Sequence, residues 1–127
     1  MTTRVSRGYV KLDRTLIQRI RHSRRIGVDQ EQIIAAVTAV TGYALADLAS
    51  PRRDRAVSYA RHLAMFALFE HGRWGVGQIG NLLGNRDHST VLGGIKRIEL
   101  ERTTRPETTA DVANVARLLE DMLESLS

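Results

Sequence analysis

The chain has 127 residues, of which 43% are hydrophobic, 26% charged and 5% aromatic. This length and balance fit one compact domain with tails and exclude a multidomain protein. No stretch of the sequence reaches the roughly 20 consecutive apolar residues of a membrane-spanning helix, and none near Met1 has the apolar core of a signal peptide. The chain contains no cysteine, which excludes disulfide frameworks and thiolate chemistry. We expect a soluble, cytoplasmic protein that makes no membrane contact.

The charge balance favours a polyanionic partner. Nineteen Lys and Arg residues against 14 Asp and Glu give a net charge of +5, and such an excess attracts nucleic acid. The excess lies at one end, because residues 1–28 carry +7 and residues 99–127 carry −4. Seventeen of the 19 basic residues are Arg, whose planar guanidinium suits phosphate and guanine better than Lys does. A GC-biased genome that favours Arg codons is an alternative explanation.

Apolar residues recur with the helical period, and no segment alternates as a half-buried strand does. The sequence thus predicts an all-α fold. We divide it into a basic N-terminal arm over 1–28, with a short helix over 13–24, and a helical domain over 29–127. In the first helix of the domain, Asp29 and Gln32 form a capping-box pattern and Gly42 marks the end.

The middle of the chain predicts a helical turn at 46–48, an exposed basic loop over 50–55, a long helix over 55–70 and a two-turn helix over 76–83. Pro51 requires extended backbone before it, which fits a loop. The long helix has an inward face of small alanines that allow close helix packing. Gly84 is expected to end the two-turn helix.

Asn85 and Arg86 predict a tight turn, after which Asp87 can cap the next helix. The inward face of that helix is expected to consist of Val91, Leu92, Ile95 and Ile98. Two helices joined by a tight, glycine-containing turn describe a helix-turn-helix. A polar linker over 102–108 and an acidic amphipathic helix over about 112–123 are expected to complete the domain.

The exposed face of the second helix of this pair is small and basic. At about 100° per residue, one stripe holds Ser89, Gly93 and Lys96, and the next holds Thr90, Gly94 and Arg97. Each glycine costs roughly 1 kcal/mol relative to Ala, so the pair indicates a close approach or a loosened helix. A helix lying deep in the major groove would use such a bare surface.

The first turn of this helix carries the candidate base contacts, because a recognition helix meets base edges there. Asp87, His88 and Ser89 supply donors and acceptors, and Thr90 with the free backbone N–H groups suits a phosphate. The alternative is structural: Asp87 is only an N-cap, the other three are ordinary surface residues, and the loop arginines are merely solvated.

At this point the sequence resembles a known family. Residues 84–92, which read Gly-Asn-Arg-Asp-His-Ser-Thr-Val-Leu, are similar to the signature of the C-terminal DNA-binding domain, domain IV, of the bacterial replication initiator DnaA. The resemblance extends from about residue 29 to 127 in the order and spacing of its helices. It implies binding to DnaA boxes, which are short, asymmetric, AT-rich duplex sites.

The resemblance implies a role for each matching residue. Asp87, His88 and Ser89 would contact bases in the major groove, and Arg53 would enter the adjacent minor groove, whose negative potential attracts a guanidinium. Arg86 would support the site. Phosphate contacts would come from Arg52, Arg55, Arg61, His62, Thr90 and Lys96. Val76 and Gly77 match a region that contacts thymine methyl groups.

Several positions depart from the family pattern. Asp54 opposes phosphate binding among the loop arginines, Asn85 replaces a common glycine, and Gly93 and Gly94 replace a bulkier pair. The sequence contains no Gly-Lys-Thr/Ser phosphate loop, so we expect DNA binding without nucleotide and no ATPase activity. The basic arm either adds nonspecific phosphate contacts or is a solvated leader.

No other motif supports catalysis. Residues 75–80 spell G-x-G-x-x-G, but no strand precedes them as a dinucleotide site requires. We expect a non-enzymatic protein without metal, cofactor or small-molecule substrate, which binds DnaA-box-like duplex DNA in origin binding or in the regulation of replication initiation or transcription. Other replication proteins are possible partners. The protein, bacterial or phage-encoded, is expected in the cytoplasm in association with the nucleoid. The alternative is a protein-interaction adaptor derived from the same domain, with weakened DNA binding.

Overall fold

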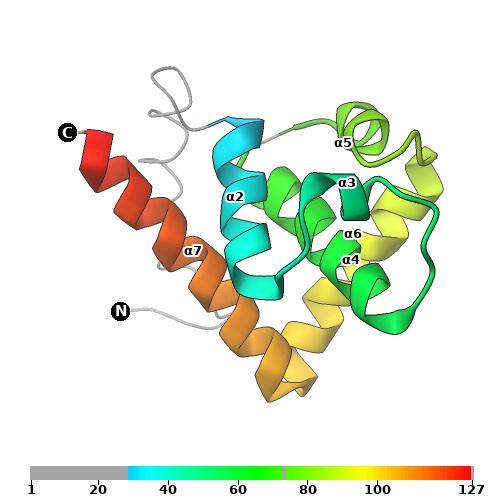
Figure 1. The fold of residues 1–127 in the computed structure, drawn as a ribbon. Coiled ribbons are helices and arrows are strands. Elements are labelled where there is room, and N and C mark those ends of the chain that lie inside the picture. The colour runs from blue at the N-terminus through cyan, green and yellow to red at the C-terminus, as the bar shows by residue number, and fades with distance from the viewer. Residues whose placement is uncertain (1–28, 73, 127) are drawn as a thin grey trace.

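The computed structural model describes residues 29–72 and 74–126, and the regular structure in these ranges is α-helical (Figure 1). The helices are α2 (Gln30–Thr41), α3 (Leu45–Leu48), α4 (Arg55–Glu70), α5 (Val76–Leu82), α6 (His88–Thr104) and α7 (Pro106–Leu126). The predicted all-α fold is confirmed. The predicted arm over 1–28, with its helix, lies outside the described residues. Among the helices of the described ranges, none is both long and apolar enough to cross a bilayer.

Helix α4 is the centre of the fold. It packs against each of the other five helices, with α2 and α7 on one side and α5 and α6 on the other (Figure 1). Ala60, Ala64 and Ala67 are buried on it, and their small side chains let neighbouring helices approach closely. The rest of the core comes from all the helices and includes Ile33, Val37, Leu48, Leu63, Phe66, Leu68, Ile79, Leu83, Val91, Ile98, Val115 and Leu119.

Local signals set the ends of α2 as predicted. The Oδ1 atom of Asp29 accepts hydrogen bonds from the backbone N–H groups of Glu31 at 3.0 Å and Gln32 at 3.4 Å. The Gln32 side chain in return accepts one from the Asp29 N–H at 2.8 Å. Gly42 ends the helix with φ of 86°, in the left-handed region that favours glycine. The capping box and the C-terminal glycine are therefore confirmed.

The predicted polar linker over 102–108 is wrong. Helix α6 continues to Thr104 and α7 begins at Pro106, so only Arg105 separates them. The Thr109 hydroxyl donates to the carbonyls of Arg102 at 2.5 Å and Arg105 at 3.1 Å, which supplies partners that carbonyls at a helix end otherwise lack. Proline also suits the first position of a helix. A short connection therefore replaces the linker.

The predicted inward face of α6 needs one correction. Val91, Ile95 and Ile98 are buried, but Leu92 is 42% exposed. Its side chain follows Val91 by one residue and so points about 100° away from the buried stripe. Of the four residues predicted for this face, three are buried and Leu92 is not.

Two glycines in the helix-turn-helix region allow close approaches. At Gly80 in α5, an added Cβ would overlap the carbonyl oxygen of Arg86, whose N–H donates back to the Gly80 carbonyl at 2.9 Å. At Gly94 in α6, a Cβ would lie 2.5 Å from Met65 Sδ and 2.9 Å from His62 Cδ2, both on α4. Gly94 is therefore buried, and its predicted place on an exposed stripe is wrong. Of the glycine pair, Gly94 makes the expected close approach, and its neighbour is α4. Gly93 faces open space.

His71, just after α4, is a buried histidine with 7% exposure. Its Nδ1 atom has no hydrogen-bond partner within the described ranges. Burial, together with the positive charge of Arg102, lowers the pKa of His71 from 6.5 to about 4. The folded protein therefore holds this imidazole neutral in mildly acidic solution.

We expect the free energy of unfolding to fall as the pH drops from 6.5 toward 4. In this window the unfolded chain binds a proton on His71 and the folded chain does not, so protonation stabilises the unfolded state. The loss amounts to roughly 3 kcal/mol by the lower pH. Urea denaturation at several pH values measures it, and His71→Leu should flatten the dependence. His88→Gln, which replaces an exposed imidazole, is the matched control. An unaltered slope in His71→Leu contradicts the expectation.

The two helical glycines Gly80 and Gly93 should respond oppositely to alanine. Gly80→Ala pushes a methyl group against backbone that cannot move aside, and overpacking of this kind costs about 1–3 kcal/mol. Gly93→Ala meets open space and should stabilise by up to about 1 kcal/mol through helix propensity. Denaturant unfolding of the two variants beside the parent chain checks the pair. Equal effects at both positions would be inconsistent with the packing of α5 on the turn.

Candidate nucleic-acid interface

The helix-turn-helix consists of α5, a turn over 83–87 and α6. Two successive turn residues have positive φ, 93° at Gly84 and 61° at Asn85. Asparagine is one of the few residues other than glycine that adopts this conformation readily. The departure from the family pattern at position 85 therefore preserves the turn.

Asp87 caps α6 and organises its first turn. Its Oδ1 atom accepts hydrogen bonds from the Thr90 N–H at 2.8 Å and the Ser89 hydroxyl at 3.1 Å. The bonds from Thr90 and then Ser89 hold the pKa of Asp87 below its ordinary value. The N-cap role is confirmed, and all three residues are exposed. Their predicted base and phosphate contacts stay predictions.

His88, the first residue of α6, is exposed and lies against α5. Its Nε2 atom is 3.3 Å from the position that a Cβ at Gly77 would take. The missing side chain of Gly77 thus leaves room for the imidazole, whereas Val76 packs partly buried against the core. His88 makes no hydrogen bond to the described residues, so both ring nitrogens are available to a ligand.

The arginines of the basic loop between α3 and α4 differ in their contacts. Arg52 forms ion pairs with Asp47 at 3.5 Å and Asp54 at 3.1 Å, and its guanidinium lies 5.7 Å from the centre of the Tyr43 ring. Asp54, expected to oppose phosphate binding, therefore also fixes a neighbouring arginine. These contacts reduce the charge that Arg52 offers to a phosphate.

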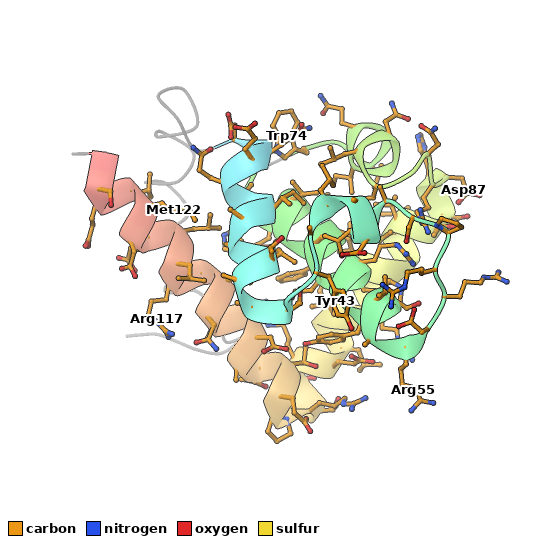
Figure 2. All side chains as sticks on the ribbon, viewed as in Figure 1. Tyr43, Arg55, Trp74, Asp87, Arg117 and Met122 are labelled. Carbon is orange, nitrogen blue, oxygen red and sulfur yellow. The ribbon has the colours of Figure 1, made fainter. Side chains whose placement is uncertain are left out.

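The neighbouring cations are Arg53 in this loop and Arg55, the first residue of α4. Both side chains are exposed, and neither side chain has a hydrogen bond or ion pair within residues 29–72 and 74–126. Figure 2 shows Arg55 and Asp87 projecting from the same side of the molecule, and the loop joins the two regions (Figure 1). Arg55 and the loop ribbon thus lie on the same side of the molecule as Asp87 at the start of α6.

Arg61 is buried beneath the loop. Its guanidinium donates to the carbonyls of Leu48 at 2.7 Å, Ser50 at 3.0 Å and Arg52 at 2.9 Å. The side chain is 6% exposed, and burial, with the nearby charge of Arg86, lowers its pKa. Arg61 therefore supports the loop, and the phosphate contact that the resemblance implies for it is wrong because its guanidinium is buried and bonded to backbone carbonyls.

Arg86 supports the same loop from the turn. It donates to the carbonyls of Leu83 at 2.6 Å and Ser50 at 2.8 Å. These bonds fit the supporting role expected of Arg86, although the sequence did not indicate what it supports. The carbonyl acceptors of Arg61 and Arg86 leave no signature in a sequence, and neither does the ring of Tyr43 beneath Arg52.

Two further candidates lie along α4 and α6. His62 is half-buried beside Gly94, and burial, with the charges of Arg97 and Arg61, lowers its pKa. The shift favours the uncharged imidazole, which can donate one hydrogen bond and accept another. Lys96 is exposed on α6 without an ion pair to the described residues. Within those residues no group of His, Asp and Glu side chains could hold a metal ion.

Comparison with known proteins identifies the family. Residues 30–98 match the family model described as the bacterial dnaA protein helix-turn-helix. Relatives named chromosomal replication initiator protein DnaA include that of Thermomicrobium roseum, 38% identical over 92 residues, which are 72% of this chain and 20% of the relative. The one from Sphingopyxis alaskensis is 35% identical over 105 residues, 82% of this chain and 23% of the relative.

The chain spans about a fifth of the length of these relatives. The matched region contains α2 to α5 and most of α6, and so includes the loop, the turn and the first turn of α6. The chain belongs to the bacterial DnaA helix-turn-helix family.

Proposed function

We propose that this chain binds duplex DNA at DnaA-box-like sites and acts in origin binding or in the regulation of replication initiation or transcription. The first turn of α6 enters the major groove, with His88, Asp87 and Ser89 at base edges. Arg53 enters the adjacent minor groove. Relatives named as chromosomal replication initiators support this role.

The observation that carries the proposal is that two exposed side chains of different chemistry, the imidazole of His88 and the guanidinium of Arg53, are both available to DNA. His88 and Arg53 have unused hydrogen-bonding groups, and the elements that bear them are bonded to each other through the Ser50 carbonyl. A rigid connection of this kind lets a protein read both grooves of one site. Arg55, Lys96, Thr90, His62 and, more weakly, Arg52 supply phosphate contacts.

Selection of bound sequences from a randomised duplex pool tests the function. We expect one enriched, asymmetric, AT-rich motif resembling a DnaA box, bound equally with and without ATP because the sequence contains no phosphate loop. Failure to enrich any motif, combined with capture of replication proteins by the same chain, would favour the adaptor instead.

His88→Ala should remove base readout while leaving general affinity intact. We expect binding to the selected duplex to weaken by about 1–3 kcal/mol, with little change on random duplex. Fluorescence anisotropy with both duplexes measures this, and Arg117→Ala on the far side of the molecule (Figure 2) is the control. Equal losses on both duplexes remove His88 from base readout.

Arg53→Ala should lose the preference for A·T pairs next to the major-groove site, because a narrow A·T minor groove attracts a guanidinium. Competition between duplexes with A·T or G·C pairs at those positions measures the preference. Arg55→Ala, which removes a neighbouring cation, should weaken all the duplexes alike. If Arg53→Ala also weakens them alike, the arginine contacts only phosphate.

A further inference from the structure

Beneath the interface, and not on its surface, two arginine side chains share one hydrogen-bond acceptor. Guanidinium groups from two separate elements, Arg61 of α4 and Arg86 of the turn before α6, donate to the same carbonyl oxygen, that of Ser50. The two bonds measure 3.0 and 2.8 Å. We call this contact the arginine clasp.

The clasp costs electrostatic energy, since it brings two positive charges together at a buried site. No carboxylate is hydrogen-bonded or ion-paired to either guanidinium within the described residues, and the hydrogen bonds of both go to backbone carbonyls. Each arginine also donates to other carbonyls: Arg61 to those of Leu48 and Arg52, and Arg86 to that of Leu83. The hydrogen bonds to the carbonyls of residues 48, 50 and 52 thus fix the loop segment that precedes Arg53.

The clasp therefore connects three parts of the molecule. One oxygen atom, that of the Ser50 carbonyl, joins the loop that carries Arg53 to the central helix α4 and to the turn before α6. A guanidinium suits such a junction because its planar fork holds several acceptors in fixed directions, whereas an ammonium group holds them as a single point charge.

We propose that Arg61 and Arg86, by donating together to the Ser50 carbonyl, are positioning residues that hold Arg53 at a fixed offset from the first turn of α6. The proposal rests on the proposed function, in which Arg53 and α6 read adjacent grooves of one duplex. The clasp then sets the spacing between the minor-groove and major-groove parts of the recognised site. Neither arginine contacts DNA in this role.

The first measurement uses the protein without DNA. Because the chain has no cysteine, nitroxide labels can be placed at Arg53→Cys and Leu100→Cys, both exposed positions. Electron–electron distance measurements should give a narrow distribution in the otherwise unmodified chain. The distribution should broaden in Arg61→Lys and in Arg86→Lys, which keep the charge and lose the fork. Arg117→Lys on α7 is the matched control. A distribution that stays narrow in both variants overturns the proposal.

The second measurement tests selectivity in the unlabelled chain. Arg86→Lys should lose A·T preference at the minor-groove positions by the same factor as Arg53→Ala, and should keep the discrimination that depends on His88. The double variant Arg53→Ala/Arg86→Lys should lose no more than Arg53→Ala alone, because both substitutions remove one interaction. Thermal unfolding of each variant confirms that it is folded.

Other outcomes contradict the positioning role. A lower salt dependence of binding with selectivity retained identifies a direct phosphate contact. Equal loss of all discrimination, including that due to His88, identifies a general structural role. If the parent chain itself prefers no duplex sequence, the proposed function fails and the role in selectivity fails with it, while the distance measurement still decides whether the clasp fixes the loop.

Discussion

The place of α6 depends on how closely it crosses α4 at Gly94. With no side chain there, the helix lies directly against Met65 and His62, and the buried Val91, Ile95 and Ile98 fix its rotation about its own axis. Every exposed group on its first turn then has a defined direction. The interface is therefore a product of core packing, because interiors are dense enough to allow few alternative arrangements.

The sequence predicted the features that depend on neighbouring residues. Asp29, Gly42 and Asp87 mark helix ends through hydrogen bonds or φ angles formed within a few residues, so each was predicted correctly. The bounds of α4 agree with the periodicity for the same reason. The local signature at 84–92 was sufficient to indicate the family, which the comparison confirmed.

Features that depend on contacts between distant segments were not predictable in this way. The short connection at Arg105 depends on a threonine hydroxyl from the following helix. The sequence predicted an exposed Gly94, because the helical period alone does not say how near α4 lies. The sequence predicted a surface position for Arg61. Its hydrogen-bond acceptors are backbone carbonyls, which every residue has, so no residue type in the sequence indicates them.

Helix α7 lies on the opposite side of the described structure from Arg55 and Asp87 (Figures 1 and 2). It carries five carboxylates and one arginine, whereas the loop, the start of α4 and the middle of α6 carry the exposed Arg52, Arg53, Arg55, Lys96 and Arg97. This separation gives the described part of the molecule an electric dipole. The electric field of a nearby polyanion exerts a torque on this dipole and turns the cationic side toward the polyanion before contact. Productive encounters therefore become more frequent, and added salt weakens the effect.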